Sequence, residues 1–427
     1  MLNFLHITAL VCSIFPLIEM TKIRRFYCII PVALIFDFAM VIPCLLEMFM
    51  GPPTTVYYNF RNAMMDEKTN LIFYLFIIIA QVCFYFEIRR IKWKNKKSMN
   101  YNISQPSRIY NKIVNSRYRK QVIGLCYLVI LLSIIAVLLA PDPTYYLKLH
   151  SVYSTMSQTV YNYDKNIISI IQNLLLIAIV LLKIYDDKDS RIFFITRILC
   201  TIGVALLNQK RTTVMLILGF CLVIDIAFKN KNLKKTMIKY IPAIILVAIY
   251  FWAYALITEK ISYNQDWYYV INEYFFRNIH TKFSIYAELY PNKVHILDYP
   301  CQAILCDFLF FIPRSLWLAK PHNYPYYFIA GLLNYGNVTE KTWIMPTSYY
   351  PEFVSNFGII GLLISIFFTI FICRYLDKKD SFIKMGGIAI ISVLQIYYYD
   401  DMLKILAMIV LAMIILQKCS FNGKRIL

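Results

Sequence analysis

Residues 121–140 decide the fold class: they read QVIGLCYLVILLSIIAVLLA, without a charged residue. A helix needs about 20 mostly apolar residues to cross about 30 Å of bilayer hydrocarbon. Comparable runs recur along the chain, at 2–20, 26–50, 70–88, 121–140, 166–183, 191–208, 212–228, 238–258, 352–373, 385–399 and 401–417. We therefore predict an all-α polytopic membrane protein with about 11 (10–12) transmembrane helices.

Composition excludes the other large classes. Of the 427 residues, 59% are hydrophobic and 16% charged, and mean hydropathy is +0.57. A soluble chain is about 45–50% apolar and about 25% charged, so a soluble enzyme, a disordered protein and a disulfide scaffold are all excluded. The first apolar run has no basic segment before it and no small-residue cleavage site, which favours a retained span over a signal peptide.

The net charge of +20 is concentrated in five loops. The loop at 89–120 alone holds eleven Lys or Arg and no acid. All five fall on the same side of an eleven-span arrangement, so the positive-inside rule predicts that they are cytoplasmic and that the N-terminus is outside. This distribution also argues against nucleic acid as a partner. The other clusters are Lys22, Arg24 and Arg25; Lys229, Lys231, Lys234, Lys235 and Lys239; Arg374, Lys378, Lys379 and Lys384; and Lys418, Lys424 and Arg425.

One long non-cytoplasmic segment interrupts this pattern. We predict an N-terminal transmembrane bundle over 1–258, a large external loop or cap with short helices over 259–351, and C-terminal transmembrane helices over 352–427. Structureless loops of such length are uncommon and are usually functional. The segment is rich in aromatic residues, among them Trp267, Trp317 and Trp343, which suit stacking on sugar rings, although an interfacial aromatic belt is the alternative. The apolar stretch 301–312 is too short to span and is expected to be re-entrant or interfacial.

Several cations lie on the predicted outer face, although the positive-inside rule predicts few Lys or Arg there. Lys210 and Arg211 lie in a short external turn, where they suit an anion such as phosphate; snorkelling to lipid headgroups is the alternative. Arg314 and Lys320 flank Trp317, and Arg277 lies three residues before His280. Several external cations together predict a polyanionic ligand such as a diphosphate.

The motif residues of the late external segment resemble those of bacterial O-antigen (oligosaccharide repeat-unit) polymerases. They are Pro313-Arg314-Ser315-Leu316-Trp317, Lys320-Pro321, Pro346-Thr347-Ser348, Glu352 and Asn356-Phe357-Gly358-Ile359-Ile360-Gly361. Arg211 occupies the place of an earlier external arginine of that family, but Asn208-Gln209-Lys210 precedes it where the family commonly has Gly. The large loop also lacks a clear second arginine-to-glycine repeat.

The resemblance implies a GT-C-like membrane glycosyltransferase at the outer face of the bacterial cytoplasmic membrane. Its substrate would be an undecaprenyl-diphosphate-linked oligosaccharide, polymerised into O-antigen, capsule or exopolysaccharide, with a flippase and a chain-length regulator as expected partners. Arg211 and Arg314 would stabilise the leaving diphosphate, supported by Lys210, Arg277 and Lys320. Glu352, His280 and Glu273 are candidates for the general base. Trp267, Trp317, Trp343 and Asn356 would bind the sugar, although Asn356, Gly358 and Gly361 also suit packing and turns.

No cofactor or metal is expected, because phosphate-loop, HExxH and paired CxxC motifs are missing from the sequence. Cys301 and Cys306 are expected to be free thiols. An O-antigen ligase-type enzyme stays open as an alternative, as does a lipid-linked oligosaccharide flippase or transporter. Three acids, Asp37, Glu47 and Glu87, lie in or near spans, where an acid is either a functional candidate or a solvated span end.

Overall fold

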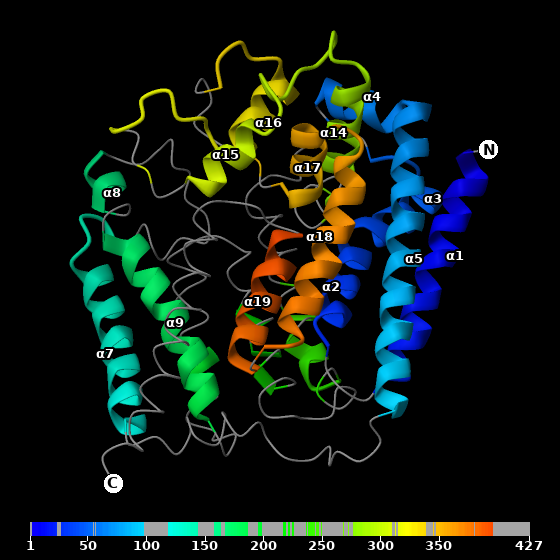
Figure 1. Cartoon of the computed structure of the whole chain (residues 1–427). Coiled ribbons are helices and arrows are strands. Elements are labelled where there is room, and N and C mark those ends of the chain that lie inside the picture. The colour runs from blue at the N-terminus through cyan, green and yellow to red at the C-terminus, as the bar shows by residue number, and fades with distance from the viewer. Residues whose placement is uncertain are drawn as a thin grey trace. The chain divides into compact units, whose positions relative to one another are not determined.

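The structure, a computed structural model, consists of helices joined by turns and irregular segments in the part of the chain that it describes (Figure 1). That part comprises residues 2–23, 27–53, 57–97, 118–143, 158–163, 167–186, 195–198, 276–309, 315–338, 347–379 and 381–395, scattered residues between 217 and 249, and residues 55, 268, 272, 312 and 345. The elements are α1 (Leu2–Thr21), α2 (Ile29–Phe36), the π-helix η1 (Asp37–Val41), α3 (Ile42–Met50), α4 (Tyr58–Met65), α5 (Glu67–Lys97), α7 (Arg119–Leu138), α8 (Gln158–Tyr163), α9 (Ser169–Tyr185), α14 (Asn278–Leu289), α15 (Gln302–Phe308), α16 (Tyr324–Leu333), α17 (Tyr349–Phe357), α18 (Gly361–Leu376) and α19 (Ser381–Leu394).

Four described helices are long and apolar enough to cross a membrane: Leu2–Thr21, Ile29–Met50, Glu67–Trp93 and Arg119–Leu138. They coincide with the first four predicted runs, so in the described part the structure forms four helices that are candidate membrane spans by length and composition. Leu174–Tyr185 and Gly361–Leu376 are shorter apolar helices. The total of about eleven stays a prediction, since the runs at 191–208, 212–228, 238–258 and 401–417 fall wholly or largely outside the described residues.

The chain divides into two compact units, and the predicted external segment belongs to the first. Unit 1 comprises Met1–Tyr101, Ser262–Lys379 and Ile390–Leu406. Unit 2 comprises Asn102–Ile261, Asp380–Ala389 and Ala407–Leu427. In unit 2, α7 packs against α9 around Cys126, Ala178 and Leu182. The early external turn with Lys210 and Arg211 lies outside the described residues.

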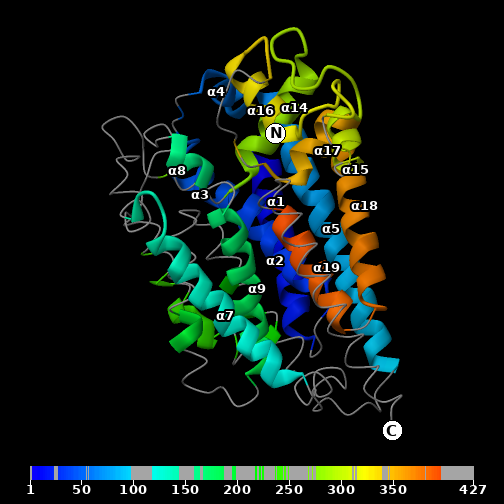
Figure 2. The same ribbon diagram turned by 90° about the vertical axis from the view of Figure 1, so that its left-hand side faces the viewer.

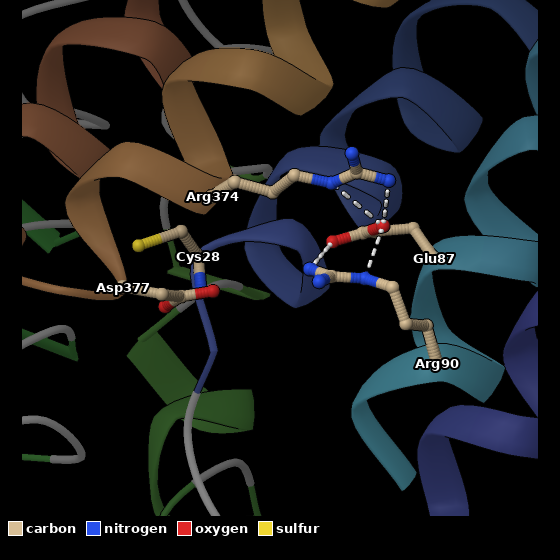
Figure 3. A network of polar contacts seen from close by, with 5 residues as sticks. All are labelled: Cys28, Glu87, Arg90, Arg374 and Asp377. Atoms are coloured by element: carbon tan, nitrogen blue, oxygen red, sulfur yellow. Dashed lines mark hydrogen bonds and ion pairs between the residues drawn. The ribbon is translucent and has the colours of Figure 1, made fainter. Parts of the chain in front are cut away.

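Charged residues tie the helices of unit 1 together where α1, α5 and α18 end and α2 begins, which we call the basic end. The buried carboxylate of Glu87 on α5 lies between the guanidinium groups of Arg90 and Arg374, joining α5 to α18 (Figure 3). Beside it, Asp377 accepts a hydrogen bond from the backbone N–H of Cys28 at 3.1 Å. Lys22 and Lys92 both pair with Glu19 near the end of α1. Three of the five predicted basic clusters therefore contribute residues to one end of this unit, as a common compartment requires.

The helices α4, α14, α15, α16 and α17 gather at the opposite end of unit 1, where α5 begins; we call them the cap helices (Figures 1 and 2). Asp66 accepts from the backbone N–H of Thr69 at 2.9 Å, which satisfies a donor in the first turn of α5. Its other oxygen accepts from the hydroxyl of Tyr290, just after α14. On α4, the Asn59 amide donates to the Leu332 carbonyl of α16 at 2.9 Å. The cap is thus part of the bundle rather than a separate domain.

The run predicted as one span over 352–373 is instead two helices, α17 and α18. The chain turns at Gly358, whose φ of +68° lies in a region that side chains disfavour. Gly361 then starts α18 so close to α17 that an added Cβ would lie 2.0 Å from the Phe353 carbonyl oxygen. The prediction that these glycines serve packing and turns is confirmed, whereas the single span is wrong because average hydropathy does not register a backbone reversal.

Gly361→Ala is therefore expected to destabilise the protein. The Cβ meets backbone rather than a flexible side chain, so α17 and α18 must separate, at an overpacking cost of about 1–3 kcal/mol. The melting temperature of the purified protein in detergent measures the loss. Gly124→Ala in α7 is the matched control, because nothing lies within 4 Å of its added Cβ. Equal melting temperatures for the two variants would contradict the close approach.

Candidate functional site

The described part of the chain includes half of the predicted site residues. Glu352, His280, Arg277, Lys320, Trp317 and Asn356 are described, all in unit 1. Arg211, Arg314, Glu273, Lys210, Trp267 and Trp343 lie outside the described residues, and their predicted roles stay predictions.

Glu352 lies in the first turns of α17 with a side chain that is 2% exposed. Burial raises the pKa of this carboxyl well above its usual range, and the hydrogen-bonded carboxyl of Asp307 on α15 raises it further. Two carboxyls in contact cannot both carry a charge at low cost, so they share a proton. With its raised pKa, such a pair holds a proton more tightly than an ordinary carboxylate and, once ionised, can take one from a hydroxyl group.

Three unpaired oxygens surround the start of α17. Oγ1 of Thr347, Oγ of Ser348 and Oε1 of Glu352 are all buried and have no hydrogen-bond donor or acceptor among the described residues. Ser348 is the extended residue directly before α17, and Glu352 lies in the first turn of that helix. Buried polar atoms normally have a partner, and several unpaired ones together indicate a place for a polar ligand or water.

Asn356 braces this site instead of pointing away from it. Its amide Nδ2 donates to the Glu352 carbonyl at 2.8 Å, and its Oδ1 accepts from the Ile304 backbone N–H at 3.5 Å. The side chain therefore holds α15, which carries Asp307, against α17, which carries Glu352. In this structure Asn356 acts on the geometry of the carboxyl pair; direct contact with a sugar stays a prediction.

A buried hydroxyl network fixes α17 to the other cap helices. The Tyr324 hydroxyl lies 2.8 Å from the Ser284 hydroxyl of α14 and 2.9 Å from that of Ser355, and it donates to the Pro351 carbonyl at 3.1 Å. Three helices, α14, α16 and α17, thus meet at one oxygen. Because Pro351 and Ser355 flank Glu352 in sequence, this network positions the turn that carries the carboxyl pair.

His280 is less suited to act as the base. Its ring packs against Phe60 and Phe328, with centroids 5.6 and 5.4 Å away. Burial, and then the charge of Arg277, hold its pKa well below the usual range, so the ring is neutral. Nε2 lies 3.1 Å from the Met345 sulfur, and because a thioether only accepts, the proton is on Nε2. Nδ1 has no partner among the described residues, so the ring keeps one free acceptor.

Two cations of the predicted diphosphate site, Arg277 and Lys320, are among the described residues, and both donate hydrogen bonds to backbone carbonyl oxygens. Arg277, 1% exposed, donates from Nη1 to the Phe276 carbonyl at 2.5 Å. Lys320 donates to the Ile312 carbonyl at 2.9 Å and is 8% exposed, whereas Trp317 is partly exposed. The structure thus places charge in the cap near the motif segment, but in buried positions.

Sequence reasoning missed Asp307, although a signal was present. It is an acid within the apolar stretch 301–312, and an acid in such surroundings is a functional candidate by default. The stretch folds in part as α15; Cys301 precedes this helix, Cys306 lies within it, and neither is in a disulfide, as predicted. Only the fold brings Asp307 to Glu352, 45 residues later in the chain.

No family model, curated protein or solved structure matches this chain. Its function must come from its own residues. The carboxyl pair with its surrounding hydroxyls is the arrangement in the described part that best suits chemistry.

Proposed function

We propose that this protein is a membrane glycosyltransferase that joins undecaprenyl-diphosphate-linked oligosaccharide repeat units into a surface polysaccharide. The observation that carries the proposal is the buried Asp307–Glu352 pair within the motif-bearing cap helices. Glycosyl transfer to a hydroxyl needs a base at the acceptor and positive charge at the leaving group. The apolar helices fit an enzyme whose donor and acceptor are both anchored in a bilayer.

In the proposed reaction, the acceptor hydroxyl oxygen attacks the anomeric carbon of the growing chain. The bond from that carbon to the diphosphate oxygen breaks, and its electron pair leaves with the lipid diphosphate. The hydroxyl proton passes to the Asp307–Glu352 pair. Arg211 and Arg314 would balance the charge on the leaving diphosphate, with support from Lys210, Arg277 and Lys320.

The aromatic residues Trp267, Trp317 and Trp343 would bind the sugar chain by stacking. A flippase and a chain-length regulator would work beside the protein in the cytoplasmic membrane of a bacterium. A ligase would share the donor and the leaving group, and differs only in the acceptor.

Deleting the gene in its native host tests the proposal directly. Surface glycan analysed on a gel should lose its ladder and retain a single repeat unit, because export and attachment still operate while polymerisation does not. Complementation by the wild-type gene should restore the ladder. Retention of long chains, or loss of all surface glycan as expected for a missing ligase or flippase, would refute the polymerase.

A further inference from the structure

Asp37 is a buried acid in the interior of a candidate membrane span. It begins the π-helix η1 in the middle of Ile29–Met50 and is 8% exposed. An acid at such a position is a functional candidate by default, and π-helical turns inside α-helices are frequent at functional sites. Asp37 has no part in the proposed glycosyl transfer.

The other buried acids of the described spans have cationic partners. Glu47 pairs with Lys282, and Glu87 lies between Arg90 and Arg374 (Figure 3). Asp37 has no ion pair with any described residue. A lone carboxylate buried in an apolar bundle is so costly that something must neutralise it.

Gln81 of α5 contacts the Asp37 carboxyl and indicates how the negative charge of Asp37 is neutralised. Its amide Nε2 donates to Oδ1 of Asp37 at 2.5 Å. The remaining oxygens of the two groups, Oδ2 of Asp37 and Oε1 of Gln81, are buried and have no donor. The carboxylate and the amide, joined by this one bond, thus leave two buried acceptor oxygens without a donor.

We propose that Asp37 is a proton-binding site, with the proton on Oδ2 donated to Oε1 of Gln81. One proton then satisfies both orphan oxygens. It closes a ring of two parallel hydrogen bonds, in which the acid donates to the amide carbonyl and the amide donates to the acid carbonyl. The same proton removes the uncompensated charge from the bundle.

The proton also supports the attachment of the cap. The Ile42 N–H reaches back five residues to the Asp37 carbonyl. Four residues after Ala39 comes Pro43, which has no N–H to donate, and the Ala39 carbonyl accepts instead from the Arg277 N–H at 2.9 Å. The rings of Phe38 and Phe276 also meet there, with centroids 5.6 Å apart. The acid–amide pair thus fixes the turn on which the N-terminal end of α14 rests.

No described cation lies within ion-pair distance of the Asp37 carboxyl to substitute for the proton. In the described part of the chain the hydrogen bond of the Asp37 carboxyl is to Gln81 alone. Tyr350 lies within electrostatic range, and its ring contacts Phe36 at a centroid distance of 5.6 Å. Titratable groups on the elements around η1 include His6, Cys12 and Glu19 on α1, Cys44 and Glu47 on α3, Tyr74, Cys83, Tyr85 and Glu87 on α5, Arg277 before α14, Lys282 on α14, and Tyr349, Tyr350 and Glu352 on α17.

Amide substitution distinguishes a protonated acid from an ionised one. In the purified full chain, Asp37→Asn should leave the melting temperature unchanged at neutral pH, because the new amide donates to Gln81 in place of the proton. At alkaline pH the wild type should melt below this variant, since losing the proton exposes the charge. Glu87→Gln is the matched control and should lower the melting temperature, because it breaks two ion pairs. If Asp37→Asn loses as much as Glu87→Gln, Asp37 is ionised and the proposal fails.

Infrared difference spectroscopy on the same protein reads the proton itself. Subtracting the Asp37→Asn spectrum from the wild type at neutral pH should leave the C=O band of a protonated carboxylic acid, shifted in D₂O. Gln81→Leu should move that band to higher frequency, because the acid loses its hydrogen-bonded amide. The signal of the Glu352 pair is common to all three proteins and cancels. A carboxylate band in its place, or a melting temperature that depends on Na⁺ in the wild type alone, would overturn the proposal.

Discussion

Glu352→Gln is expected to lower polymerisation by about 10²–10⁴-fold, the usual contribution of a general base. The amide has nearly the same shape but cannot take the acceptor proton. Polymer made from purified lipid-linked repeat units in detergent measures the loss. Because Glu352 is buried and its Oε1 has no partner among the described residues, folding is expected to tolerate the amide. An unchanged melting temperature is the control.

The pH profile separates a base from a structural residue. Burial, and then Asp307, raise the pKa of Glu352, so its proton stays bound at pH values where an ordinary Glu is ionised. A base must be ionised to act, and activity should therefore rise with pH as the pair titrates. Asp307→Asn removes the second carboxyl and lowers the pKa of Glu352, so the acid limb of the profile should move to lower pH.

Asn356→Ala gives the comparison for a positioning residue. It removes the brace between α15 and α17 and leaves both carboxyls in place. Its activity should fall without the shift of the acid limb expected for Asp307→Asn. Wild-type activity in Glu352→Gln, or an unmoved acid limb in Asp307→Asn, would show that the pair does not act as the base.

The membrane-spanning class could be predicted from sequence because it depends on local averages. A run such as 121–140 is apolar on every face, and the bilayer length requirement turns it into a span with no knowledge of its neighbours. The placement of several basic clusters at one end of the bundle could be predicted in the same way, because successive spans alternate in direction and basic loops stay on one side of the membrane. The turn at Gly358 could not, since it depends on one positive φ and on contact between α17 and α18.

Only part of the candidate site could be predicted from the sequence, because the rest depends on contacts between distant segments. Glu352 and Asn356 lie in the motif segment and could be predicted, whereas Asp307 becomes relevant only when α15 packs on α17. The helix α14 is a stronger case. Its sequence NIHTKFSIYAEL reads as a polar external segment, yet its residues from Asn278 to Ala287 are all buried. Their burial depends on partners such as Glu47, 235 residues before Lys282.

Loss of the buried Glu47–Lys282 ion pair is expected to lower the stability of the protein more than any other change considered. Lys282 and Glu47 are joined at 2.7 Å with side chains only 2% and 6% exposed, and the Asn278 amide donates to the second Glu47 oxygen at 2.6 Å. Lys282 also lies over the rings of Phe73 and Tyr74. Glu47→Gln leaves the ammonium buried without its counter-charge, which costs about 3–5 kcal/mol. A marked fall in the melting temperature of the purified protein should follow.

A double variant distinguishes the effect of losing the ion pair from the effect of losing side-chain packing. Glu47→Leu with Lys282→Met removes both charges and keeps similar volume, and a buried pair replaced in this way is often no less stable. The double variant should therefore melt well above Glu47→Gln, although the loss of the Asn278 hydrogen bond opposes full recovery. Lys22→Met at the exposed Glu19 pair is the control and should change little, since surface pairs contribute about 0–1 kcal/mol. If Glu47→Gln melts like the wild type, the cap does not depend on this ion pair.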